Sequence, residues 1–190
     1  MPKIEIKITI KIYKETEIDG CLFRCYDSGK VERKLMTTNR HGKKGDFRRC
    51  DNIKPRYNKR NDRYCIQVGI NGKTYLIHRI VYFAFNPTFD FYNPKIMIDH
   101  INRDSLDNKI SNLREATCAE NLRNTIAQKN NKLGIKNISD YENRWLVQIR
   151  KDGQTVVHRS FQKNLFTLDK VILFRDQKLL EFHKEFANIE

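Results

Sequence analysis

Four polar side chains of one stretch have the types and spacing that hydrolytic chemistry needs: Asp99, His100, Asn112 and Asn121. A hard divalent ion prefers oxygen ligands, which Asp99 and the side-chain carbonyl of Asn121 can supply, with water and phosphate oxygens completing the coordination shell. His100, neutral near pH 7, can take a proton from an attacking water. Asn112 can hydrogen-bond the histidine or its loop and fix the direction of the ring. The set predicts a metal-assisted hydrolytic site.

The adjacent Asp99 and His100 require a strand that ends at this point. Neighbouring side chains of a strand point to opposite faces, so both reach one cleft only where a loop takes over. The apolar residues 96–98 predict this short strand, and the polar stretch 102–112 predicts the loop. A brief strand over 113–116 returns from the loop.

A helix start positions Asn121. Thr117 and Glu120 have the spacing of a capping box, in which Thr117 is the N-cap and Glu120 reaches back to it. The helix that begins here would carry Asn121 in its first turn. The predicted order is strand, histidine, loop, strand and helix.

This order resembles the ββα-metal motif of HNH nucleases, in particular the HNH homing endonucleases of phages and introns. In that family the last metal-binding position is commonly Asn, as here. The residues that carry the resemblance are Ile98-Asp99-His100-Ile101-Asn102-Arg103-Asp104, Asp107-Asn108, Ser111-Asn112-Leu113-Arg114, Ala116-Thr117 and Glu120-Asn121. The stretch 75–81 with Ala84-Phe85 is similar to the sequence that leads into the motif. The resemblance covers roughly residues 64–125.

The resemblance implies one metal ion, Mg²⁺ or Mn²⁺, held by Asp99 and Asn121. It also implies that His100 is the general base and that Asn112 is the middle asparagine that positions it. The reaction would be hydrolysis of a DNA phosphodiester bond, and one such centre would cut one strand at a time.

Further polar residues beside the motif have competing interpretations. Asn108 could position the histidine, but Asn112 is favoured because it directly precedes the returning strand. His78 matches a recurrent family position, and we expect a structural residue at a helix start rather than a catalytic one. Arg79 beside it is a candidate phosphate contact. Singly, such residues are more often turn or surface residues, and only their joint spacing favours the metal site.

The expected fold class is α+β, with the central ββα-metal motif flanked by an N-terminal β-rich basic region and a C-terminal three-stranded sheet plus helix. The expected domains are residues 1–62, 63–130 and 131–190.

Local patterns in the N-terminal half indicate strands and turns. The alternating isoleucines of residues 4–12 predict a strand, whereas residues 38–62 read as a loop. Hairpin turns are predicted at Asp27-Ser28-Gly29 and at Asn71-Gly72, followed by a short helix near residues 80–85.

The C-terminal third predicts a hairpin around Lys151-Asp152-Gly153, then a helix from about Thr167 with an apolar stripe at Leu168, Val171, Ile172, Leu179, Phe182 and Phe186. The order resembles the APETALA/ERF-type DNA-binding domain. The residues that carry this resemblance are Leu133-Gly134-Ile135-Lys136, Arg144-Trp145, Gln148-Ile149-Arg150, Phe161 and 182–187. It implies that the sheet lies in the major groove, with Arg144, Trp145, Gln148 and Arg150 as contacts. Trp145 is equally expected to pack on the helix.

Charge is unevenly distributed along the chain. The 37 Lys+Arg and 23 Asp+Glu give 37 − 23 = +14, and residues 21–60 hold 13 basic and 4 acidic residues, or +9. Residues 96–130 hold five of each and are neutral. A basic block beside a neutral one favours double-stranded DNA as the partner over a merely solvated surface.

The sequence excludes several classes of protein. No run of about 18 apolar residues predicts a membrane span, and the Lys/Glu/Ile alternation at the N-terminus does not fit a signal peptide. Five cysteines without C-x2-C spacing favour free thiols, so structural zinc at Cys21, Cys25, Cys50 and Cys65 is not expected. We expect an intracellular protein of the host cytoplasm or nucleoid, encoded by a mobile or viral element.

These observations predict a metal-dependent DNA endonuclease of the homing type. The alternatives are a dimeric HNH restriction endonuclease that cuts a palindromic site, and a DNA-binding regulator with an inert nuclease centre. The sequence leaves monomer and homodimer both open.

Overall fold

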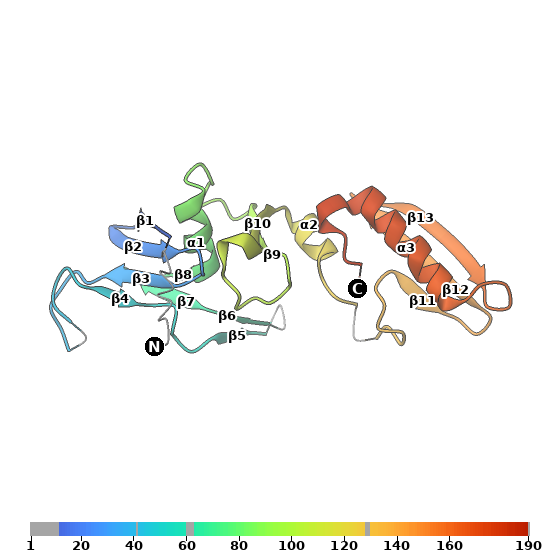
Figure 1. Cartoon of the computed structure of the whole chain (residues 1–190), viewed down its shortest axis with the longest axis horizontal. Helices are drawn as coiled ribbons and strands as arrows, with labels where there is room; N and C mark the ends of the chain where they lie inside the picture. The colour runs from blue at the N-terminus through green and yellow to red at the C-terminus, as the bar shows by residue number, and fades with distance from the viewer. Residues whose placement is uncertain (1–11, 41, 60–62, 128–129, 190) are drawn as a thin grey trace, which may run out of the picture. The chain divides into compact units, whose positions relative to one another are not determined.

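The computed structural model describes residues 12–40, 42–59, 63–127 and 130–189 (Figure 1). It is a mixed α/β structure of several small sheets and few helices, as the expected fold class requires. Its contacts divide the chain into two compact units, Met1–Glu115 and Ala116–Glu190. No helix in the described ranges is long and apolar enough to cross a membrane.

The first unit begins with a four-stranded antiparallel sheet, whose strands follow the chain order. They are β1 (Tyr13–Ile18), β2 (Cys21–Tyr26), β3 (Val31–Lys34) and β4 (Phe47–Arg49). The predicted hairpin at Asp27-Ser28-Gly29 is confirmed as the turn between β2 and β3. The strand predicted over residues 4–12 lies outside the described residues, except for Ile12, which belongs to no strand.

Two small hairpins follow: β5 (Arg56–Asn58) with β6 (Arg63–Cys65), and β7 (Gln67–Ile70) with β8 (Lys73–Leu76). The second confirms the turn at Asn71-Gly72, whose φ angles of 48° and 79° suit a tight hairpin turn. The expectation of a loop over residues 38–62 is wrong in part, because β4 and β5 lie within it. The basic sequence has no clear strand periodicity here, but the cross-strand aromatic pair of Tyr57 and Tyr64 stabilises the β5–β6 hairpin.

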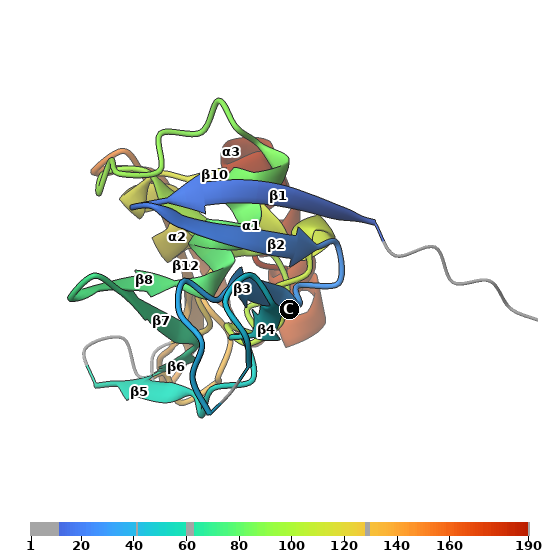
Figure 2. The same cartoon turned by 90° about the vertical axis from the view of Figure 1, so that its left-hand side faces the viewer.

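Helix α1 (Ile77–Phe85) covers the sheet and completes the core of this unit. Its buried side chains are Ile77, Ile80, Val81 and Ala84, and it packs against β1 and β2 (Figure 2). Helix α1 ends before Asn86, because the following Pro87 disfavours helical backbone there.

One hydrophobic core joins the two segments that the sequence separated at residue 62. Phe23, Cys25 and Val31 share a buried cluster with Ile80 and Leu113. The N-terminal strands and helix α1 therefore bury each other's apolar surface across residue 62, and the domain boundaries stay a prediction.

The segment that resembles the ββα-metal motif consists of β9 (Met97–His100), the 3₁₀ turn η1 (Ile110–Asn112), β10 (Leu113–Ala116) and α2 (Cys118–Arg123). Strands β9 and β10 pair as a two-stranded sheet. The capping box is confirmed, because the Glu120 N–H donates to Thr117 Oγ1 and the Thr117 N–H donates to Glu120 Oε2. The contact-based division falls after Glu115, so α2 belongs to the second unit and not to a domain that ends at residue 130.

The second unit contains the three-stranded sheet of β11 (Ile138–Asp140), β12 (Arg144–Lys151) and β13 (Gln154–Gln162). Helix α3 (Leu168–His183) lies along this sheet, and the turn η2 (Lys184–Phe186) follows it (Figure 1). The predicted apolar stripe is only partly correct, because the buried row of α3 is Val171, Arg175, Leu179 and His183.

Candidate active site

Asp99 and His100 occupy the end of β9 and are both buried, with 4% and 5% of their surfaces exposed. The β9 strand stops at His100, and the loop that follows turns back through η1 into β10. The structure thus provides the strand end that the sequence analysis required for this pair. Buried titratable groups side by side at a strand end are typical of a reactive site.

Arg114 on β10 holds the carboxylate of Asp99. It donates from Nε at 2.9 Å and from Nη2 at 2.8 Å, both to the same oxygen, Oδ2. Because both bonds fall on one oxygen, this ion pair anchors Oδ2 without itself using Oδ1. Arg114 is among the residues that carry the family resemblance, but the sequence predicts no role for it.

Asn108 holds the ring of His100. Its Oδ1 lies 3.2 Å from His100 Nε2, so the amide oxygen accepts the Nε2–H of the neutral ring. In that tautomer Nδ1 carries the lone pair that can accept a proton. Burial lowers the pKa of His100, against opposing contributions from Asn108 and from the charge of Asp99. A neutral, oriented imidazole is what a general base requires.

Asn112 fixes the loop between the histidine and β10. Its Nδ2 donates to Asn102 Oδ1 at 2.9 Å and to the Asp107 carbonyl at 2.8 Å, while its Oδ1 accepts the Asn102 N–H at 2.9 Å. The sequence predicts that Asn112 hydrogen-bonds the histidine or its loop, with Asn108 as the less favoured candidate. The structure brings Asn108 to the ring and Asn112 to the loop, and the catalytic importance of each stays a prediction.

The β2–β3 turn supports the same loop from behind. The Ile110 N–H donates to the Asp27 carbonyl at 3.0 Å. At Gly29, where φ is +83°, a Cβ atom would lie 2.6 Å from the backbone carbon of Asn108. Only glycine therefore permits this approach, and the N-terminal sheet sets the position of Asn108.

His78 lies at the start of α1, edge-on to His100, with ring centroids 4.9 Å apart and planes at 84°. Burial, with a smaller contribution from His100, lowers the pKa of His78 to about 3. The ring is therefore neutral at every working pH, which suits the structural role that the sequence suggested.

Arg79 binds the loop that precedes β9. Its guanidinium donates to four backbone carbonyls, those of Asp90, Phe91, Asn93 and Ile96, at 2.7 to 3.1 Å. A guanidinium has five N–H donors, so these bonds leave at most one for a phosphate. The predicted phosphate contact stays a prediction, and the geometry favours a structural role.

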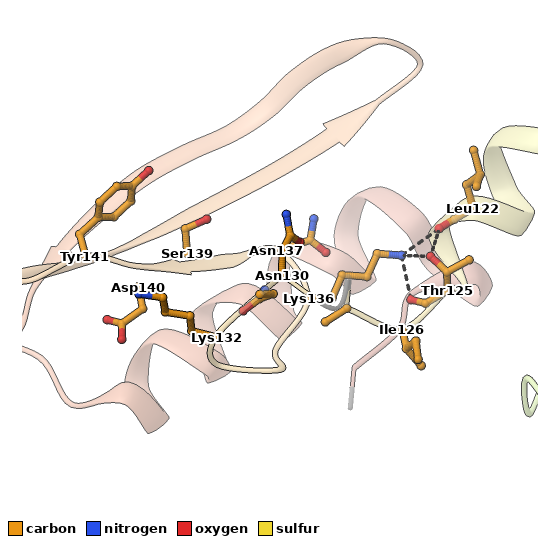
Figure 3. A pocket seen from close by; sticks show the side chains of 12 residues that line it. Leu122, Thr125, Ile126, Asn130, Lys132, Lys136, Asn137, Ser139, Asp140 and Tyr141 are labelled. Carbon is orange, nitrogen blue, oxygen red and sulfur yellow. Dashed lines mark hydrogen bonds between the residues drawn. The ribbon is translucent and has the colours of Figure 1, made fainter. Parts of the chain in front are cut away.

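Asn121 lies on α2, and residues of the second unit anchor this helix. Lys136 directs its ammonium at the carbonyls of Leu122, Arg123 and Thr125, at 2.8 to 2.9 Å (Figure 3). This contact satisfies carbonyls at the C-terminal end of α2. Arg123 also forms an ion pair with Asp152 at 2.7 Å. The role of Asn121 as a metal ligand stays a prediction.

A cavity of about 700 Å³ lies next to the Lys136 contact. Leu122, Ile126, Lys132 and Tyr141 are among its lining residues (Figure 3). Its described lining includes none of the predicted catalytic or metal-binding side chains.

The donor set suits a hard, water-rich ion. Among the described residues there is no group of three or more His, Cys, Asp or Glu side chains that could hold a metal. One carboxylate and one amide oxygen fit Mg²⁺, which keeps several waters and takes phosphate oxygens as ligands. Asp99 would be the charged ligand, because its position is fixed by Arg114 through Oδ2.

The buried cysteines serve as apolar groups. Cys25 and Cys50 donate weakly to the carbonyls of Ile80 and Val31. Burial raises the pKa of the Cys25 thiol and raises that of Cys50 to about 12. Burial therefore favours the neutral thiol at both positions.

The predicted DNA contacts of β12 lie on two faces of the sheet. Arg144, Gln148 and Arg150 are exposed and lie on one face of the strand, where they alternate with the core-facing residues. Trp145 lies on the opposite face with Val147 and Ile149 and packs against the core of the second unit. The geometry thus favours the core role that the sequence left open for Trp145.

Comparison with known proteins identifies the nuclease motif. Residues 75–123 match the family model of HNH endonucleases. This segment is therefore an HNH endonuclease domain, and a chain that carries it is a DNA endonuclease. The chain is also similar to a solved structure of DNA binding and cleavage by the HNH homing endonuclease I-HmuI. The similarity has 20% identity and a TM-score of 0.38, over 90% of this chain and 91% of the other. No curated protein sequence matches the chain.

Proposed function

We propose that this protein is a metal-dependent homing-type endonuclease that hydrolyses phosphodiester bonds at a specific site in duplex DNA. The observation that carries the proposal is the buried Asp99-His100 pair at the end of β9, with His100 held at Nε2 by Asn108. The pair lies within the segment that matches the HNH endonuclease family.

The histidine would generate the nucleophile. Nδ1 of His100 accepts a proton from water as the water attacks the phosphorus atom, and Asn108 keeps the Nε2–H directed away from the substrate. The lowered pKa of His100 leaves the ring unprotonated before the attack.

Asp99 and Asn121 would hold Mg²⁺ or Mn²⁺. A bound ion of this kind stabilises negative charge on the pentavalent phosphorus and on the leaving 3′ oxygen. Arg114 holds Asp99 in position for this task through their largely buried ion pair at 2.8 Å.

Exposed polar and basic residues of β12 would bind the duplex. Arg144, Gln148 and Arg150 form an exposed row on β12 that suits contact with base edges and phosphates, as in the APETALA/ERF-like domain that the second unit resembles. Specific cleavage requires both the nuclease domain and such a reading surface.

The test is incubation of a supercoiled plasmid with the full chain in Mg²⁺, Mn²⁺ or EDTA. We expect nicking with either metal and none in EDTA. Asp99→Ala should abolish nicking, whereas Glu142→Ala, which removes an exposed charge in the second unit, should not. Nicked circles would support a centre that cuts one strand, and symmetric linear products would favour the dimeric restriction enzyme. Cleavage that persists in EDTA would contradict the proposal.

A further inference from the structure

The hairpin of β5 and β6 exposes a pair of aromatic rings. Tyr57 and Tyr64 are opposite each other in the strand register, with ring centroids 5.2 Å apart, and are 52% and 53% exposed. Among the described strands none other pairs with this hairpin. The pair stabilises the hairpin but leaves about half of each ring in solvent, and such exposed apolar surface commonly marks an interaction site.

Basic residues flank the two tyrosines in sequence, and Arg56 and Arg63 point to the opposite face of the hairpin, because neighbouring side chains of a strand alternate. Arg56, Lys59 and Arg63 are all exposed, and Arg63 is opposite Asn58 in the register. Within the described parts of the chain, none of the three cations forms an ion pair. Protein-binding interfaces are depleted of charge at their centres, so a short hairpin that exposes three cations as well as two tyrosines favours a polyanion over a protein partner.

The hairpin is bonded directly to the catalytic loop. Ser105, which lies between His100 and Asn108 in the sequence, donates from Oγ to the Tyr64 carbonyl at 2.6 Å. This bond joins the hairpin to the loop that connects the predicted base with Asn108.

We propose that the β5–β6 hairpin binds the sugar–phosphate backbone of the duplex beside the scissile bond and seats the DNA against His100. Arginine and lysine bind phosphates, and a tyrosine pair offers flat surface to a sugar or an unstacked base and hydroxyl groups to phosphate oxygens. This inference rests on the proposed endonuclease function. The Ser105 hydrogen bond links the hairpin to the loop that follows His100, so DNA bound by the hairpin would lie beside the general base.

The binding test uses the full chain in the His100→Ala background and a short fluorescein-labelled duplex. Tyr57→Ala with Tyr64→Ala should weaken binding about tenfold, whereas the double change to Phe should keep most of the affinity. Arg63→Ala should lower the slope of log affinity against log salt by about one. The charge-matched control is Lys170→Ala on α3, which should leave the slope unchanged. Equal slopes for the two charge variants would overturn the proposed contact of Arg63.

The coupling test measures plasmid nicking in Mg²⁺ with His100 restored. Ser105→Ala should slow nicking severalfold at unchanged duplex affinity, because the hairpin and catalytic loop lose their bond. Unchanged thermal melting of each variant excludes unfolding as the cause. Nicking by the wild type together with wild-type binding and nicking by the tyrosine variants would overturn this inference alone. Failure of the wild type to nick, with reduced binding by the tyrosine variants, would overturn the proposed function and leave the hairpin contact supported.

Discussion

His100 combines burial with a hydrogen bond at one nitrogen, and these two features assign different tasks to its ring atoms. Burial disfavours the imidazolium, so the neutral ring is favoured and can act as a base. The Asn108 amide oxygen accepts the Nε2–H and thereby leaves the proton-accepting lone pair on Nδ1. Asn108 thus selects the tautomer in which His100 can act as a base.

Replacement of Asn108 should therefore change both rate and pH dependence. We expect Asn108→Ala to slow single-turnover cleavage about tenfold, because the ring loses its fixed tautomer and direction. Asn108→Asp should raise the pKa of His100, since a carboxylate stabilises the imidazolium. The acidic limb of the pH–rate profile, expected below the ordinary histidine value of about 6.5, should then move to higher pH. An unchanged profile in Asn108→Asp would contradict this assignment.

His183 gives the second unit a dependence on pH. It is buried in α3, its Nε2 lies 3.0 Å from the Arg150 carbonyl, and burial lowers its pKa. As pH falls below about 6.5, the unfolded chain binds a proton that the folded chain resists, so stability is lost on the acidic side. His183→Gln can donate to the same carbonyl but does not titrate. The difference in melting temperature between wild type and variant should shrink as pH falls, and a constant difference would refute the argument.

At the scale of elements, the N-terminal sheet acts on the active site through one turn. The β2–β3 turn meets the catalytic loop at Asn108 and Ile110, with no room for a side chain at Gly29. The sheet therefore determines the conformation of a loop that is distant in sequence.

Gly29→Ala should both destabilise the first unit and slow cleavage, because the new methyl group displaces the Asn108 backbone. The matched control is Gly20→Ala, which has a similar φ of +76° but nothing within 4 Å of its Cβ. Both variants carry the strain of a positive φ, so only the clash differs between them. Melting temperature and cleavage rate measure the two effects, and equal cleavage rates in both variants would count against the contact.

Elements governed by local chemistry could be predicted from the sequence. The Asn71-Gly72 hairpin and the Thr117/Glu120 capping box are examples, because their signals lie within a few residues. The three-residue strand β4 could not, since the strand forms by pairing with β3 across a basic loop. The sequence offered both Asn108 and Asn112 as partners of His100, and the choice of Asn108 depends on the tertiary approach of Gly29 to its backbone. Asp99 and His100 could be predicted from the sequence, because a strand end and the spacing typical of the family coincide there.

At the scale of the whole molecule, the net charge of +14 dominates the encounter with DNA. Lysine and arginine release counterions from the duplex as they bind phosphates, so affinity should fall steeply with salt. The exposed row of β12 should contribute to this dependence, whereas Trp145 on the opposite face should contribute to stability.

The double change Arg144→Ala with Arg150→Ala should reduce the salt slope of duplex affinity by up to about two and leave the melting temperature nearly unchanged. Trp145→Ala should instead lower the melting temperature of the second unit, because a core-facing ring is removed. Fluorescence anisotropy across a salt series and thermal melting distinguish the two. A wild-type slope in the double arginine variant would exclude this face from the DNA interface.

The central claim is that His100 generates the nucleophile for DNA hydrolysis, and its most direct test is single-turnover plasmid nicking in Mg²⁺ by wild type and His100→Ala. We predict a loss of about 10² to 10⁴ in rate for the variant, the range that a positioned general base contributes. Duplex affinity and melting temperature should remain close to those of the wild type. Nicking by His100→Ala at the wild-type rate would show that the active site lies elsewhere in the chain.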